Sequence, residues 1–331
     1  MIKRVKSLFR PVAVGLCAAA LVTACATQPG SDTLTLNERD YFERPGVNVL
    51  AFANPPGGLF FDAKTSGVEI IHHGERTATN GDVRLLPTPE QWDGMGQLVE
   101  RRVIRDSQRV ETQLAYPEHD FEYTVVTEAQ GDKVLMRVLL DEPLPAALEG
   151  KAGLNMEFVP AAYFGKGYLA DGVAGTFPRH PAGPMIVKDG LTESTPFAQG
   201  QHLVLAPEDP KRTVSIRNLR DERELMLYDG RNKAQNGWYV VRSLLPAGES
   251  GVVAEWELDI NGIPGWTRDP VISYSQLGYH PAQNKRAIIE LDANAQPEGA
   301  ARLLRVKDSG ATEVVKQGTP ETWGDYLRYQ Y

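Results

Sequence analysis

Three groups of residues have types and spacings that could support chemistry. His72 and His73 are adjacent. Neighbouring side chains on a strand point to opposite faces, so we expect a strand-end pair with one ring inward and one outward, a poor metal chelate. Residues 165–170 match G-x-G-x-x-A, but no helix is predicted to follow, as a dinucleotide site requires. Asp120 and Glu122 share a strand face and could act as paired glycosidase carboxylates, although we expect them to be solvated. The sequence therefore predicts no catalytic residue, no metal site and no cofactor.

Aromatic side chains offer a different chemistry, because their flat apolar faces stack on sugar rings while their polar edges stay wet. Trp92 lies in a Pro-Glu-Gln-Trp-Asp loop, and Trp238 follows Asn236 and Gly237. Both are candidates for an exposed glycan contact. Trp256 falls on the apolar face of an alternating run, so its expected place is the core.

The elements that would position these residues are predicted to be strands. Residues 121–127 and 133–140 are rich in strand formers and flank a short turn with Gly131, which predicts a hairpin. Residues 238–244 and 252–260 predict another antiparallel pair, because the later run alternates between apolar and acidic side chains.

Helical patterns are few. Residues 89–107 carry scattered apolar side chains interrupted by Gly94 and Gly96, which predicts at most one short helix or a loop. Residues 144–148 suggest a single turn. Strands without regular intervening helices favour sandwiches. We therefore predict an all-β protein with a large N-terminal β-sandwich over 40–265, and a domain boundary near Trp266 after a turn-rich stretch.

The N-terminus has the features of a bacterial export signal. Four cations precede an apolar run at 12–22, and residues 21–25 (Leu-Val-Thr-Ala-Cys) resemble a lipobox. The resemblance implies a signal peptide over 1–24 and a lipid on Cys25, with a tether over 25–39. The expected location is the bacterial envelope, with the membrane as a partner through the lipid. Ala26 after the cysteine favours the outer membrane.

Composition narrows the class of partner. The chain has 42% hydrophobic and 24% charged residues, as in a soluble globular protein. Its net charge of -8 excludes the basic field that nucleic-acid binding needs. Cys17 lies inside the signal and Cys25 is the lipidation candidate, so no disulfide is expected and packing must supply the stability.

One stretch near the C-terminus carries a family resemblance. Residues 268–291 place an apolar strand before a turn motif and a second strand after it. The motif residues are Ser275, Gln276, Gly278, Tyr279, Pro281 and Lys285. The pattern resembles the opening of the immunoglobulin-like domain that precedes the catalytic barrel in many family 9 glycoside hydrolases of the cellulase type. The resemblance implies that residues 266–331 begin such a domain and that the motif residues are structural.

The resemblance is partial. An immunoglobulin-like sandwich needs about seven strands and roughly 100 residues, whereas 268–331 has room for four or five, and the family's paired-aspartate motif and acid glutamate have no counterpart. We therefore expect this chain to be the non-catalytic N-terminal portion of a glycoside hydrolase, truncated before the catalytic barrel. The intact parent enzyme is expected to act on a β-linked polysaccharide or oligosaccharide. Two alternatives stay open: a stand-alone glycan-binding surface lipoprotein, and an enzyme with its active site in the front sandwich.

Overall fold

The computed structural model describes residues 33–54, 65–89, 93–188, 190–220, 223–233, 237–295 and 299–331. Antiparallel strands make up nearly all of its regular structure, which confirms the predicted all-β class. The α-helix α1 (Pro160–Tyr163) and four short 3-10 turns complete it. Within these ranges, none of the helices has the length and apolarity that crossing a bilayer requires.

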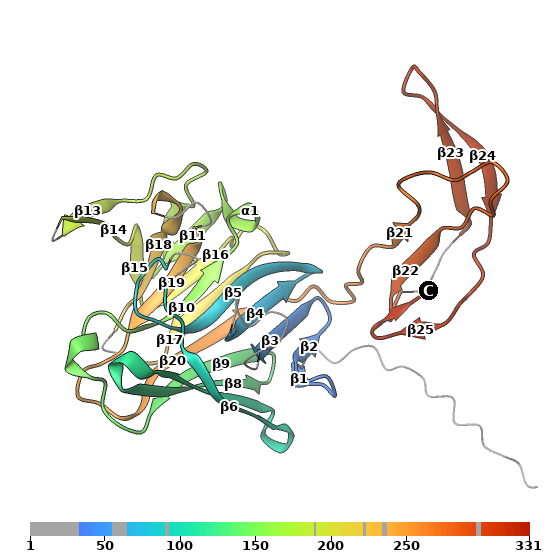
Figure 1. Cartoon of the computed structure of the whole chain (residues 1–331). Coiled ribbons are helices and arrows are strands. Elements are labelled where there is room, and N and C mark those ends of the chain that lie inside the picture. The colour runs from blue at the N-terminus through green and yellow to red at the C-terminus, as the bar shows by residue number, and fades with distance from the viewer. Residues whose placement is uncertain are drawn as a thin grey trace, which may run out of the picture.

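Two nine-stranded antiparallel sheets form the main body (Figure 1). The first sheet has the order β1 (Thr35–Leu36), β2 (Phe42–Arg44), β3 (Val47–Ala53), β4 (Ser66–His72), β5 (Glu75–Arg84), β10 (Gly153–Phe158), β19 (Tyr239–Leu244), β18 (Leu225–Asp229) and β15 (Ala198–Gly200). The second has the order β12 (Val173–Thr176), β11 (Gly167–Ala170), β16 (His202–Leu205), β17 (Val214–Asn218), β20 (Gly251–Ile260), β9 (Lys133–Leu140), β8 (Phe121–Gln130), β7 (Arg109–Tyr116) and β6 (Gln97–Ile104).

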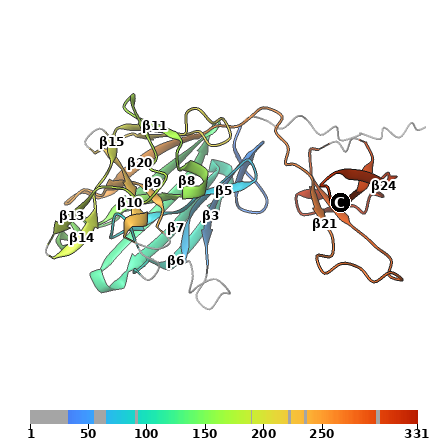
Figure 2. The same cartoon turned by 90° about the horizontal axis from the view of Figure 1, so that it is seen from above.

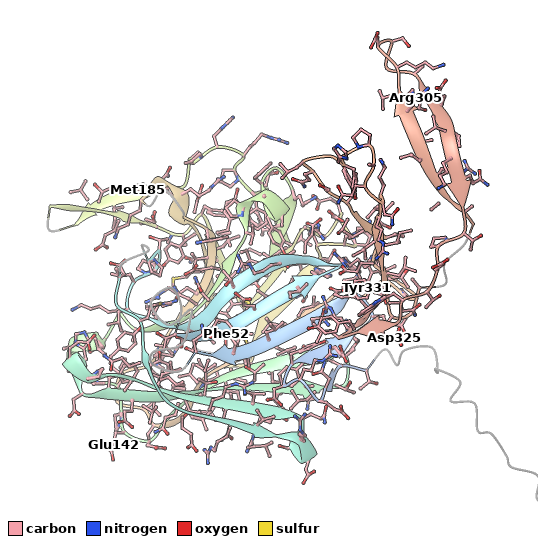
Figure 3. The ribbon with its side chains drawn as sticks, turned by 45° about the vertical axis from the view of Figure 1, so that its right-hand side comes forward. Phe52, Glu142, Met185, Arg305, Asp325 and Tyr331 are labelled. Carbon is pink, nitrogen blue, oxygen red and sulfur yellow. The ribbon has the colours of Figure 1, made fainter. Side chains whose placement is uncertain are left out.

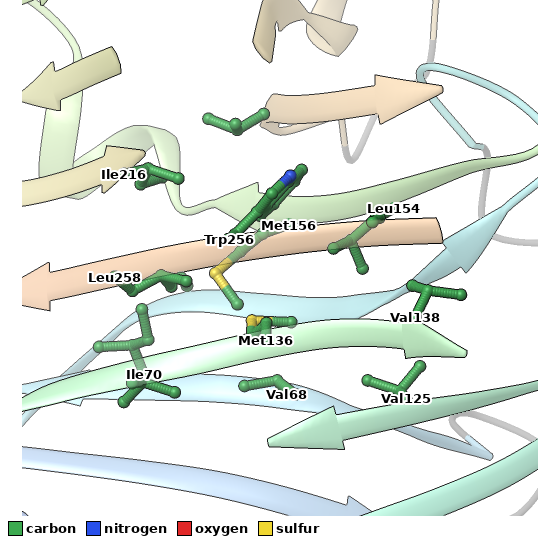
Figure 4. Packing of buried hydrophobic residues seen from close by; sticks show 14 of the residues in the cluster. Val68, Ile70, Val125, Met136, Val138, Leu154, Met156, Ile216, Trp256 and Leu258 are labelled. Carbon is green, nitrogen blue, oxygen red and sulfur yellow. The ribbon is translucent and has the colours of Figure 1, made fainter. Parts of the chain in front are cut away.

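The apolar core lies between these two sheets. Trp256 of β20 is fully buried, and its indole Nε1 donates a hydrogen bond to Ser243 Oγ of β19, 2.9 Å away in the facing sheet. Met136 and Met156 pack around the same ring (Figure 4). Alternation along β20 turns Ala254, Trp256, Leu258 and Ile260 inward, which explains why this strand was readable from the sequence.

Of the two predicted strand pairs, one forms and one does not. The predicted hairpin is present, because β8 and β9 pair antiparallel. The predicted pairing of residues 238–244 with 252–260 is wrong, because β19 lies between β10 and β18 while β20 lies between β17 and β9. Both strands turn apolar faces to one core, and the chain between them crosses from sheet to sheet. Alternation identifies the inner face of a strand and leaves its neighbours undetermined.

Residues 97–104 form strand β6, where at most a helix or loop was expected. β6 lies at the edge of its sheet and has half-exposed and exposed side chains, so it lacks an apolar alternation. A side chain at Gly96 would collide with the Tyr123 hydroxyl, which shows that this glycine permits a close approach of the backbone. The sandwich also begins earlier than expected, since Leu34 and Leu36 belong to the core although 25–39 was predicted to be a tether.

The C-terminal region, residues 266–331, stands apart from the main body (Figures 1 and 2). It contains six strands where four or five were expected: β21 (Val271–Ser273), β22 (Ile288–Asp292), β23 (Ala301–Val306), β24 (Thr312–Gly318), β25 (Asp325–Tyr326) and β26 (Tyr329–Gln330). The hairpin β23–β24 is a sheet of its own and carries Arg305 away from the body (Figure 3). Among the described residues after Ile260, no side chain is buried.

Candidate functional site

A buried carboxylate lies between the sheets on β5. Asp82 is 2% exposed and accepts hydrogen bonds from Tyr123 Oη at 3.1 Å and Ser66 Oγ at 3.4 Å. Burial raises the pKa of Asp82 although the guanidinium of Arg84 opposes the rise. Together with Thr112 and Thr127, Ser66 and Asp82 line a cavity with room for about one water molecule. A sugar cannot reach this carboxylate, so we assign it a structural role.

Two arginines extend this polar interior. Burial alone would lower the pKa of Arg84. The nearby carboxylates of Asp82 and Glu157 outweigh this effect, so the pKa of Arg84 is raised above its usual value. Arg242 donates to Asn155 Oδ1 at 2.6 Å and to backbone carbonyls that include that of Leu86, 2.9 Å away. Burial lowers its pKa to about 10, so it stays a cation at neutral pH. Asn155 and backbone carbonyls thus compensate much of the buried Arg242 charge, while the Nε atoms of Arg84 and Arg242 are left without a hydrogen-bond partner.

The histidine pair has a different arrangement from the expected one. His72 and His73 are both buried, so the prediction of one inward and one outward ring is wrong. The reason is the backbone: His73 has φ of 50° in the turn after β4, which breaks the strand alternation. Their rings stack with centroids 4.5 Å apart, and Trp266 packs edge-on against His73 at 5.3 Å. In the described part of the chain, no group of His, Cys, Asp and Glu side chains is arranged to hold a metal.

The motif around residue 279 is a closed loop between β21 and β22. The Tyr279 hydroxyl accepts a hydrogen bond from the Ser275 N–H at 3.0 Å and donates one to the carbonyl of Arg286. Lys285 Nζ donates to the carbonyls of Pro281 and Gln283, each 3.1 Å away. Gly278 has φ of 81°, which a residue with a side chain rarely adopts. The motif tyrosine, lysine and glycine thus fix the shape of this loop.

Beside this loop the C-terminal region displays apolar side chains to solvent. We call them the C-terminal apolar surface: Val271, Ile272, Ile288, Leu303, Leu304, Val306, Val314, Val315, Trp323, Tyr326 and Leu327. Most of them lie on strands, where one face of a sheet is normally covered. Exposed apolar side chains on strands are typical of an interaction site or of an unpaired layer of a sandwich.

The other predicted site residues are dispersed. Cys25 and Trp92 lie outside the described residues. Trp238 is half-buried just before β19, and its carbonyl accepts the Gly230 N–H at 2.8 Å. Glu122 is exposed and accepts a hydrogen bond from Gln113, so the glycosidase-pair interpretation gains nothing from the geometry. Trp323, in the C-terminal region, has 77% of its surface exposed.

Comparison with known proteins identifies no family for this chain. No protein-family model and no curated protein matches the chain. Eight solved chains match. One of them is a heparinase III with methylated lysines, with 7% identity and a TM-score of 0.35 over 88% of this chain. The chain spans 42% of the length of that structure. A likeness this low gives no information on activity or substrate.

Proposed function

We infer that this chain is the non-catalytic front portion of an exported glycoside hydrolase of the family 9 type. In this proposal the sandwich is a rigid platform, and the C-terminal region is the first layer of an immunoglobulin-like module that further β-structure covers. The whole protein would act on a β-linked polysaccharide or oligosaccharide, held at the envelope by a lipid on Cys25.

The C-terminal apolar surface is the observation that carries this proposal. Burying a Val or Leu side chain contributes about 1.5–3 kcal/mol, and residues such as Leu304 and Val306, which are exposed here, gain little of it. Strands with this composition are typical of a sheet that packs against a second layer. The closed motif loop from Ser275 to Lys285 supports the same interpretation, because the resemblance rests on its residues.

Two tests separate this proposal from its alternatives. Purified protein covering 26–331 should release no reducing sugar from cellulose, xylan or chitin oligomers. Release above a buffer blank that scales with protein concentration would reject a non-catalytic role and favour an active site in the sandwich. Sequencing the gene beyond the Tyr331 codon should show an open frame that encodes a helical barrel with paired aspartates. A stop codon at that point would reject the proposal that the chain is the front portion of a larger glycoside hydrolase.

Exposed aromatic rings support one second candidate, a stand-alone glycan-binding lipoprotein. Trp323, Tyr274 and Tyr326 each have more than half of their surface exposed, and such rings are suited to stack on sugars. Affinity electrophoresis in gels containing soluble β-glucan tests it. Retardation that Trp323→Ala abolishes and Trp238→Ala leaves unchanged would favour this candidate, whereas equal mobility with and without glycan would remove it.

A further inference from the structure

Two histidine rings hold the linker that leaves the sandwich. His72 Nε2 lies 2.6 Å from the Asn261 carbonyl oxygen. His73 Nδ1 lies 3.2 Å from the Lys211 carbonyl oxygen, and its Nε2 accepts the backbone N–H of Ile263 at 3.3 Å. We call these two rings and the segment 261–266 that they bind the histidine latch.

The hydrogen bonds determine where each ring carries its proton. A carbonyl oxygen only accepts, so His72 must be protonated on Nε2 and His73 on Nδ1. His73 Nε2 must be unprotonated, because it accepts from Ile263. His72 Nδ1 is buried and has no hydrogen-bond partner. The closed latch therefore requires both rings to be neutral.

A second proton on either ring has no acceptor. On His73 it would face the N–H of Ile263 and break that bond, and on His72 it would be a buried, unpaired donor. The charged groups around the rings are mostly cations, with two acids: Arg44, Lys211, Arg212 and Arg268 against Asp209 and Glu75. Glu75 is paired with Arg212, and Asp209 with Lys166 at 2.7 Å, so neither acid is available as a full counter-charge.

We propose that the histidine latch is a pH-dependent hinge: protonation of His72 and His73 releases the linker from the sandwich and frees the C-terminal region to reorient. Trp266 would leave its position beside His73 and over the turns at Gly46 and Gly74. Asn261 would keep its bonds to the carbonyls of Thr213, 3.0 Å from its N–H, and Pro210, 2.8 Å from its Nδ2, so the hinge lies after this residue. Beyond the linker, Arg328 ties the C-terminal region to the sandwich through Asn48 Oδ1, 2.7 Å from its Nη1, and through the side chain of Tyr41.

The sign of the pH dependence follows from linkage. Burial, with the neighbouring cations, lowers the pKa of His72 from 6.5 to about 4 and also lowers that of His73, although their backbone hydrogen bonds oppose the shifts. A released ring therefore binds a proton more readily than a latched one. The latch is fully stable above pH 6.5 and loses stability as pH falls toward 4. For His72 alone, these values make opening about 30-fold more favourable at pH 5 than at pH 7.5.

Hydrogen–deuterium exchange of the whole chain tests the hinge. Peptides that cover 261–266 are followed at pH 7.5 and pH 5, and each rate is divided by the intrinsic rate at that pH. We expect protection to fall at least tenfold in the linker at pH 5, while peptides from β8 and β9 keep theirs. The double variant His72→Gln/His73→Gln cannot take up the protons and should lose the pH response. The control His202→Gln removes a histidine that bonds Ser215 at 2.7 Å, far from the linker in sequence, and should keep it.

Unchanged linker protection in the wild-type chain between the two pH values would overturn the proposal, as would a full response in the double variant. If that variant does not fold, nitrogen-15 NMR of the wild-type histidines decides. The expected neutral forms are Nε2–H for His72 and Nδ1–H for His73 at pH 7.5, and the opposite tautomer at either ring contradicts the latch.

Discussion

At the residue scale, stability depends on one large ring that joins the two sheets. Trp256 fills the space between them and satisfies its N–H on Ser243. Trp256→Ala should lower the free energy of unfolding by about 3–5 kcal/mol, because it opens a large cavity in a packed core. Urea unfolding followed by circular dichroism measures the change. Trp323→Ala is the matched control and should cost less than about 0.5 kcal/mol, since that ring is exposed. Equal losses in the two variants would contradict the described packing.

A second residue-scale prediction concerns Cys25. The lipobox predicts that this thiol receives a diacylglyceryl group and that the new N-terminus is acylated, which together exceed the single chain needed for marginal anchoring. Cells given a fatty-acid probe should label the wild-type protein and leave Cys25→Ser unlabelled. The control Cys17→Ser keeps the candidate site and should keep the label. Label that survives in Cys25→Ser would refute lipidation at this position.

At the element scale, tight turns fix the latch in place. Gly46 has φ of 75°, and a Cβ there would lie 2.6 Å from His73 Cδ2. Gly46→Ala should therefore combine backbone strain of about 1–2 kcal/mol with a collision against the latched ring. Gly131→Ala in the β8–β9 hairpin is the control, since Gly131 has φ of 65° and no atom within 4 Å of the added Cβ. Chemical denaturation should show a larger loss for Gly46→Ala, and equal losses would contradict the close contact between this turn and His73.

Sequence patterns predicted which segments form strands better than they predicted which strands pair with one another. The hairpin β8–β9 was predictable because a glycine turn joins two local strands. The assignment of β19 and β20 to opposite sheets was not, because strand pairing depends on long-range contacts. The burial of both His72 and His73 was hidden for a related reason: it requires a left-handed backbone at His73 and carbonyls from residues 211 and 261. The closing bonds of Tyr279 and Lys285 agree with a structural role, although the motif's family assignment stays a proposal.

At the scale of the whole molecule, the chain divides by burial into two unlike parts. The core runs from Leu34 to Ile260 and includes both large sheets. The described residues beyond it bury no side chain, yet their strands carry many apolar residues. Ordering this backbone costs about 1–2 kcal/mol per residue without an equivalent gain from burial. The C-terminal region should therefore be the least stable part of the isolated chain.

Limited proteolysis at pH 7.5 is the most direct measure of this division, which underlies the proposed function. A protease of broad specificity should first cut within 268–331 and trim the chain back toward the linker at 261–266. Mass spectrometry should then identify a persistent fragment that contains 33–260, with the circular dichroism of an intact β-sandwich. If the sandwich is digested first, and the segment 268–331 survives as a stable core, then the C-terminal strands do not need a covering partner and the account is wrong.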